Sequence, residues 1–216
     1  MHRILLLFSL LTLLAAVVVR KLNGDRVLYS LRDKKLRVTS TELARSMLDS
    51  VDQKHVELKT PKLSWAAAAD TGNKWLSLPS DIAGAVSVSA HGQAALKVGL
   101  YLLSLRSPKV VARRRWAVRF GYVFPIFTTI VVIFALIVAR LHGLWGFGII
   151  MASCGLSACA QLLTLGAERQ AAALAAVVLE KKRILPRLSD EEDVVSATNA
   201  WAWRSVLPGV LARLVP

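Results

Sequence analysis

The sequence predicts a mainly α-helical membrane protein: an N-terminal anchor helix, a small α+β unit, a transmembrane helical hairpin and C-terminal helices. Hydrophobic residues make up 55% of the 216 residues and charged residues 19%, and the mean hydropathy is +0.49. Soluble domains are usually about a quarter charged, so this balance favours a membrane protein. One uncharged apolar run precedes a basic middle segment, and two more separate that segment from a nearly neutral C-terminal one.

Residues 1–19 are expected to form an N-terminal transmembrane anchor. Residues 4–19 carry no charge. A cleaved signal peptide would have an apolar region of similar length. However, the run ends in Arg20 and Lys21, and no small-x-small cleavage site follows it. We therefore expect the anchor to be retained.

Residues 120–165 are expected to form a transmembrane hairpin. The run 120–139 supplies 20 uncharged residues, about enough to cross a hydrocarbon core of ~30 Å. The second run, 144–165, is rich in Gly, Ala, Ser and Cys, which let helices approach closely. Only residues 140–143 lie between the two runs, so the hairpin should be tight.

The distribution of Lys and Arg predicts the orientation of these spans. Residues 20–119 contain 19 Lys and Arg against 8 Asp and Glu, whereas the hairpin tip contains one Arg. Because basic loops stay on the cytoplasmic side, residues 20–119 and the C-terminus are predicted to be cytoplasmic. Basic clusters beside apolar spans favour contact with anionic lipid. The residues predicted to make that contact are Arg113, Arg114, Arg115, Lys181, Lys182 and Arg183.

Residues 20–119 are predicted to form one small α+β unit, too short for a second domain. Thr39 and Glu42 have the spacing of a capping box that starts a helix ending near Asp49. Residues 55–60 and 74–79 alternate in polarity and are typical of short strands. After Pro79, Ser80 or Asp81 could cap a long helix over about residues 80–105.

Residues 166–216 are predicted to form a C-terminal helical segment. Ser189 and Glu192 have capping-box spacing at the start of one helix. Residues 200–215 are apolar but too short to span a membrane, and two tryptophans lie near their start. They fit either a helix at the membrane interface or a helix packed on the protein's own core.

Several short motifs occur in the order that the membrane-embedded neutral zinc metallopeptidases of the bacterial YugP-like type show. The segment TSTELARSMLD (39–49) is similar to that family's T-G-x-E-[VL]-A-R-x-[IL]-L-D helix. Further on, SAHGQAAL (89–96) is similar to A-A-H-E-x-G-H-A, and LGAERQAA (165–172) to L-P-V-E-F-D-A-S. The resemblance covers roughly residues 38–185 and implies a multi-pass protein of a bacterial inner (cytoplasmic) membrane.

The resemblance implies a zinc site whose positions are largely replaced in this chain. His91 matches the first zinc ligand and Glu168 the downstream carboxylate, but Gly92 occupies the position of the catalytic glutamate and Ala95 that of the second histidine. A zinc-peptidase helix needs two imidazoles four residues apart and a glutamate that takes a proton from metal-bound water. We therefore expect no catalytic residue and no cofactor, with His91 packed against Glu168 or a backbone group.

The alternative is a zinc ion held by non-standard ligands. His91 and Glu168 would then need a third protein ligand, because catalytic zinc typically keeps three. Asp70 and Gln93 are the candidates. For Glu168 without a metal, the expected surroundings are a solvated face, the neighbourhood of Arg169, or His91 itself.

The predicted function is that of a catalytically inactive relative, a pseudoenzyme acting as a membrane binding or scaffold protein. It would hold a partner at the place where the peptidases of the family have their active-site cleft, with His91 and Glu168 side by side. The alternatives are an active membrane zinc metallopeptidase with non-standard ligands and an unrelated structural or assembly subunit of a membrane complex. The expected partners are the lipid bilayer and another membrane protein or a peptide. Nucleic acid is not expected, because no zinc-finger spacing or aromatic-basic motif is present.

Overall fold

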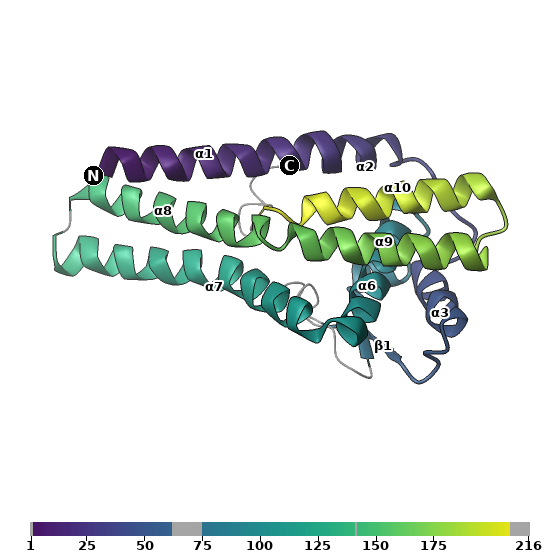
Figure 1. The fold of residues 1–216 in the computed structure, drawn as a ribbon. Helices are drawn as coiled ribbons and strands as arrows, with labels where there is room; N and C mark the ends of the chain where they lie inside the picture. Colours follow the sequence, from purple (N-terminus) through teal and green to yellow (C-terminus); the bar gives the residue numbers. More distant parts are fainter. Residues whose placement is uncertain (1, 62–74, 141, 208–216) are drawn as a thin grey trace.

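The computed structural model describes residues 2–61, 75–140 and 142–207 of the chain. These residues form long helices and one two-stranded sheet. Three helices run together toward one end of the molecule, and the remaining helices and the sheet gather at the other end (Figure 1).

The first helix is longer than the predicted anchor. Helix α1 (His2–Arg20) continues through a π-helical turn, η1 (Lys21–Asp25), into α2 (Arg26–Ser30). The apolar part of α1 leaves large side chains exposed, as expected of a helix that faces lipid. These side chains are Leu7, Phe8, Leu10, Leu11, Leu14 and Val18.

Helices α7 (Pro108–Val138) and α8 (Gly143–Leu162) form the hairpin, and α8 packs against both α7 and α1. Helix α7 starts twelve residues before the predicted span, with Pro108 in its first turn, where a missing N–H costs nothing. Within the described residues, three helical stretches are long and apolar enough to cross a membrane: 6–30, 108–138 and 143–182. The chain therefore has the composition and helix lengths of a membrane protein.

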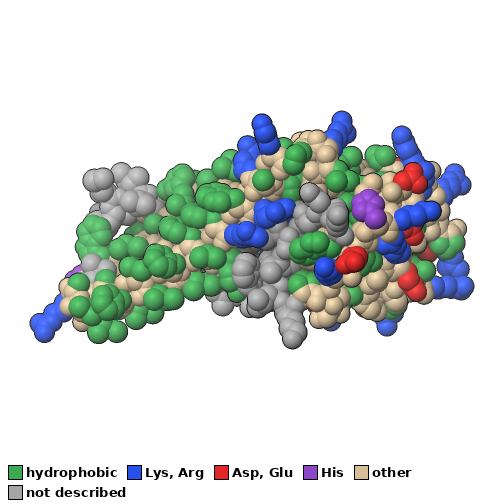
Figure 2. Space-filling model, turned by 90° about the horizontal axis from the view of Figure 1, so that it is seen from below, with side chains coloured by type: hydrophobic (Ala, Val, Ile, Leu, Met, Phe, Trp, Pro, Cys, Tyr) green, Lys and Arg blue, Asp and Glu red, His purple; other side chains and the backbone are tan. Residues whose placement is uncertain are grey.

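The surface separates into an apolar part and a charged part. Figure 2 shows hydrophobic side chains covering much of the elongated end, and Lys, Arg, Asp and Glu gathered over the broader end. The large exposed side chains of α7, including Phe127, Phe134 and Ile137, belong to the apolar part. This division agrees with a bilayer around the ends of α1, α7 and α8.

The first elements predicted for residues 20–119 are present in the structure. Helix α3 (Ser40–Ser50) begins with a complete capping box: Glu42 N–H donates to Thr39 Oγ1, and Thr39 N–H donates to Glu42 Oε2 at 2.6 Å. Strands β1 (Glu57–Lys59) and β2 (Trp75–Ser77) lie within the two predicted strands and pair in parallel.

The single helix expected over about residues 80–105 is two helices, α5 (Ser80–Ala83) and α6 (Val88–Arg106). Ser87, rather than Ser80 or Asp81, caps the long helix, because its Oγ accepts from Ala90 N–H. The chain just before α6 and the first residue of α6 instead bond to the segment before α3. Leu36 N–H donates to Val86 O at 2.8 Å, and Val88 N–H donates to Lys34 O at 3.1 Å.

Helices α9 (Leu165–Lys182) and α10 (Leu188–Arg204) complete the fold by packing against α6. The prediction that Ser189 caps α10 is wrong, since Arg187 is the N-cap residue and Ser189 lies inside the first turn. Of the segment 200–215, the described part packs on the protein's own core, where Val206 and Leu207 contact the cluster around Ala16. Residues 208–215 lie outside the described part of the chain.

The capping box generates a prediction about pH. The hydrogen bond from the Thr39 backbone, aided by the Thr39 hydroxyl, holds the pKa of Glu42 below its usual value, about 4.3. A carboxyl group with a lowered pKa in the folded state stabilises the protein above its unfolded pKa, and this stability is lost as the pH falls through the folded pKa. In detergent, Glu42→Gln should lower the melting temperature at pH 7, by a margin that shrinks below about pH 4.3.

Glu180→Gln makes the same change of charge at an exposed site near the end of α9 and is the matched control. Circular dichroism melts of the parent and both variants between pH 3 and 7 would measure the margin. A margin for Glu42→Gln that stayed constant over this range would contradict the role of the ionised carboxylate.

Candidate functional site

The candidate site surrounds α6, which contacts α3, α7, α9 and α10. An α-helix has 3.6 residues per turn, so residues 91 and 95 share one side of α6, whereas residues 93 and 97 lie on roughly the opposite side. The structure uses these two sides differently. The first side is packed into the core, and the second lines a cavity.

His91 is fully buried, and each of its ring nitrogens faces a backbone carbonyl oxygen. Its Nδ1 lies 2.8 Å from the carbonyl oxygen of Ser87, and its Nε2 lies 3.0 Å from that of Val38. His91 thus ties the first turn of α6 to the residue before the α3 cap. Of the two surroundings predicted for it, a backbone group is correct and Glu168 is not.

The two replaced positions of the zinc motif are closely packed. A Cβ atom on Gly92 would lie 2.5 Å from Ala197 Cβ and 2.8 Å from the backbone nitrogen of Thr198 in α10, closer than side chains approach in real structures. Ala95 is fully buried in an apolar cluster shared by α3, α6, α9 and α10. Neither position has space for the longer side chain that a zinc-peptidase helix carries there.

Glu168 is fully buried in the first turn of α9 and is held by α7. Its Oε1 accepts from Arg114 Nε at 2.6 Å, with both side chains almost inaccessible. The surroundings predicted for Glu168, a solvated face, Arg169 or His91, are therefore all wrong. The second oxygen, Oε2, has no hydrogen-bond partner among the described residues.

The described residues do not fit a catalytic zinc ion. A zinc ligand places its nitrogen ~2.0–2.1 Å from the metal, but a carbonyl oxygen already faces each ring nitrogen of His91. Glu168 is paired with Arg114 and lines the cavity on the side of α6 opposite to His91. Gln93, a candidate third ligand, also lines the cavity on that side. Asp70, the other candidate, is outside the described part of the chain.

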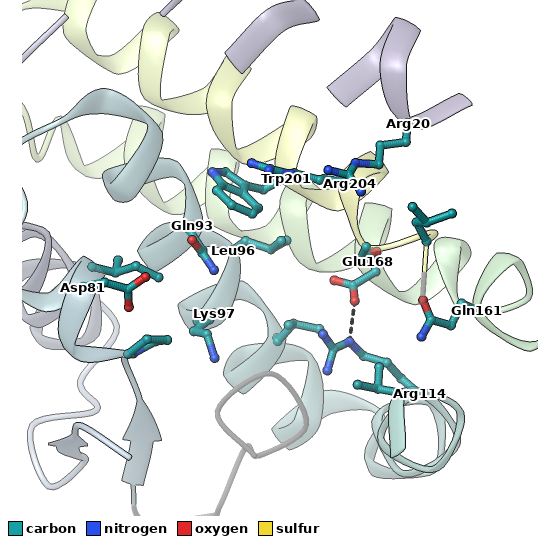
Figure 3. A pocket seen from close by; sticks show the side chains of 16 residues that line it. Arg20, Asp81, Gln93, Leu96, Lys97, Arg114, Gln161, Glu168, Trp201 and Arg204 are labelled. Carbon is teal, nitrogen blue, oxygen red and sulfur yellow. Dashed lines mark hydrogen bonds and ion pairs between the residues drawn. The ribbon is translucent and has the colours of Figure 1, made fainter. Parts of the chain in front are cut away.

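A cavity of about 460 Å³ lies on the side of α6 that carries Gln93, Leu96, Lys97 and Leu100. Figure 3 shows Trp201 and Arg204 of α10 on one side of it, and Arg114 of α7 with Glu168 of α9 on another. Its volume falls within the range of small-molecule sites. The unpartnered oxygen of Glu168 points from α9 toward the space beside Leu96 and Lys97 (Figure 3).

A second ion-pair group borders the cavity at the end of α1. Asp25 forms ion pairs with two arginines: its Oδ2 lies 3.2 Å from Arg20 Nε, and its Oδ1 lies 3.3 Å from Arg204 Nε. The π-helical turn makes the first contact possible, because its wider turn brings residues five apart onto one side of the helix. Burial, and secondarily the charge of Arg20, lowers the pKa of Arg204, while Asp25 opposes the shift.

The basic residues predicted to face lipid do not all lie at the surface. Arg113 is exposed and Arg115 is half-buried on α7. Arg114 is buried against Glu168, which corrects its assignment as a lipid-facing residue. The remaining three, Lys181, Lys182 and Arg183, are exposed at the end of α9. Their contact with lipid remains a prediction.

Sequence reasoning missed most of the cavity. Lys97 interrupts an otherwise apolar helix face, which is a signal for a buried, partnered charge. Arg20 was interpreted only as the end of the anchor, although it is 1% exposed. Trp201 and Arg204 had no such signal, because their contribution depends on how α10 packs on α6.

Comparison with known proteins agrees with the motifs. The family model described as "Putative neutral zinc metallopeptidase" matches residues 4–207, nearly the whole chain. Searches of curated proteins and of solved structures returned no match. The family match confirms the resemblance and extends it from residues 38–185 to include the first helix and α10.

The buried ion pair generates a prediction about stability. Arg114→Met leaves the Glu168 carboxylate buried without its partner, which should cost about 3–5 kcal/mol of folding free energy. The double variant Arg114→Met/Glu168→Leu removes both charges and should recover most of that loss. Arg113→Met, at the exposed neighbouring position, is the control. Denaturant unfolding in detergent micelles measures the difference; equal stability of Arg114→Met and the parent would contradict the pairing.

Proposed function

Because the chain belongs to the neutral zinc metallopeptidase family, we propose that it keeps the family's membrane scaffold and acts by binding, without cleaving peptides. The cavity beside α6 is the proposed binding site. Its partner is a lipid, a peptide or another membrane protein that enters from the bilayer or its surface. In this role the chain is a pseudoenzyme that serves as a membrane binding or scaffold protein.

The observation that carries this proposal is the use of the zinc-motif side of α6 for packing. The backbone of α10 lies where a glutamate at position 92 would begin, and Ala95 lies in the apolar core. Both ring nitrogens of His91 face backbone carbonyl oxygens. The helix that would bind zinc in an active relative therefore works here as a structural core helix.

The cavity supports the binding role, because its charged side chains are held in fixed positions. Glu168 and Arg114 are paired, and Asp25 fixes Arg20 and Arg204. Preorganised polar groups in a concave, mostly apolar site are typical of ligand binding. We place residues 20–119 and the C-terminus on the cytoplasmic side of a bacterial inner membrane, as the charge distribution predicts.

The two alternative functions are an unrelated assembly subunit and an active enzyme with non-standard ligands. Membership of the family rules out a subunit unrelated to these peptidases, although an assembly role is compatible with a binding cavity. An active enzyme with non-standard ligands would need His91 to give up a backbone contact and turn toward a metal. It would also need Glu168 to leave Arg114.

The proposal predicts that the purified full-length protein cleaves no peptide. It also predicts that substituting His91 does not change the amount of zinc bound. We expect zinc well below one equivalent by mass spectrometry and no chelator-sensitive cleavage of a casein or peptide-library substrate. His91→Ala and Glu168→Gln should leave these values unchanged. One equivalent of zinc together with chelator-sensitive cleavage, lost in both variants, would establish the active enzyme instead.

A reconstruction experiment tests the packing argument separately. Gly92→Glu/Ala95→His restores the glutamate and the second histidine of the zinc motif but forces their side chains into α10 and the core. We expect a lower melting temperature and no gain of zinc, with Gly84→Glu as a control at a position where an added Cβ meets nothing within 4 Å. Stable folding with a stoichiometric gain of zinc would show that the scaffold still accepts the site.

A further inference from the structure

We propose that the cavity beside α6 binds the headgroup of an anionic phospholipid, with its phosphodiester among the basic side chains and a headgroup hydroxyl on Glu168. This inference rests on the binding role proposed above and adds the chemical class of the ligand. Four observations carry it: the position of the cavity, its charge, the unpartnered carboxylate oxygen and its apolar lining.

The cavity lies at the level where the apolar spans meet the charged part of the molecule. Arg20 ends the apolar part of the first span, Gln161 lies in the last turn of α8, and Val118 lies between the basic start and the apolar run of α7. All three line the cavity. In a bilayer around these spans, this level is occupied by phospholipid headgroups.

The charge around the cavity favours an anion. Four cationic side chains line it, Arg20, Lys97, Arg114 and Arg204. Among the described residues, three carboxylates belong to the same group: Asp81 and Glu168 line the cavity, and Asp25 accepts from two arginines. Counted over the described residues alone, this group carries one more positive than negative charge, which matches the single negative charge of a phosphodiester.

Among the described residues, two guanidinium groups lie against one carboxylate, that of Asp25. Arg20 and Arg204 share Asp25, and burial together with the charge of Arg20 lowers the pKa of Arg204. A phosphate beside Arg204 would offset both effects. Arg204 also stacks on Trp201, with the guanidinium 4.7 Å from the ring centroid, so its position is fixed before a ligand arrives.

Glu168 supplies the acceptor that selects the headgroup. Its Oε2 is buried and has no donor among the described residues, and it points toward the cavity (Figure 3). A buried carboxylate oxygen without a donor is costly, and a ligand hydroxyl would satisfy it. A glycerol headgroup carries such hydroxyls, whereas a choline headgroup has no N–H or O–H to donate.

The apolar lining favours a lipid over a free phosphate ion. Leu96, Leu100, Val118 and Leu207 line the cavity together with the charged groups. These side chains would contact the glycerol backbone and the first acyl carbons, which a soluble phosphate lacks. The exposed apolar faces of α1 and α7 would continue the contact with the acyl chains.

The test titrates the delipidated full-length protein in detergent with dioctanoyl phosphatidylglycerol, dioctanoyl phosphatidylcholine and glycerol 1-phosphate, with native mass spectrometry counting bound molecules. We expect one phosphatidylglycerol, bound about tenfold or more tightly than the other two probes, since a hydrogen bond to a charged group is at stake. Equal binding of the two lipids would overturn the proposal. Glycerol 1-phosphate binding as tightly as phosphatidylglycerol would show a soluble-phosphate site and overturn the lipid assignment.

Variants place the binding in the cavity. Lys97→Met should weaken phosphatidylglycerol binding about tenfold, and Lys97→Arg should retain most of it. Lys109→Met, which removes an exposed cation from the first turn of α7, should bind like the parent. Unchanged binding by Lys97→Met, with a parental melting temperature, would overturn the site; if this variant does not fold, the comparison of probes on the parent still decides.

The outcome is separable from the proposed function. Loss of lipid selectivity in a protein without zinc and without cleavage would reject the lipid assignment alone. Stoichiometric zinc with chelator-sensitive cleavage would reject the binding-only role, whatever the lipid result.

Discussion

The close approach of α6 to α9 and α10 is the constraint on which the rest of the structure depends. Gly92 lies against the backbone of α10 at Ala197 and Thr198, and a Cβ on Gly99 would collide with the carbonyl oxygen of Ala171 in α9. Both glycines lie on one side of α6, because they are seven residues apart. Two neighbouring helices can therefore approach along almost the full length of the central helix.

This packing decides which chemistry remains possible. A glutamate at position 92 and close packing of α10 exclude each other, so the helix is either a zinc helix or the centre of this bundle. Once α10 lies on α6, its last turn brings Arg204 to Asp25 and Trp201 to the cavity. The loss of one site and the formation of the other thus follow from the same contact.

The sequence predicted the elements whose determinants are local. The Thr39–Glu42 capping box, the two strands and the apolar hairpin each depend on neighbouring residues. It failed where a distant segment competes. The residues after α5 bond to the segment before α3 instead of extending a helix, which moves the start of α6 to Val88.

The same limit explains the result for the candidate site. The family motifs placed His91 and Glu168 at functional positions, and the family was predicted correctly. Their partners could not be read from the motifs, because Val38 and Arg114 are 53 and 54 residues away in the chain. Arg114 in particular is one of three consecutive arginines, and only the rotation of α7 determines which of them turns inward.

The π-helical turn at Lys21–Asp25 sets the rotation of the first span relative to the rest of the protein. A π-helical turn holds about one residue more than an α-helical turn, so the extra residue is taken up locally and Arg20 and Asp25 lie on the same side of the helix. Adding or removing a residue in the regular part of α1, outside this turn, would instead rotate everything before it by about 100° about the helix axis. The lipid-facing side of α1 would then turn toward α8. The turn is therefore the place in the junction where one residue of length can be absorbed without changing which face of the anchor meets the bilayer.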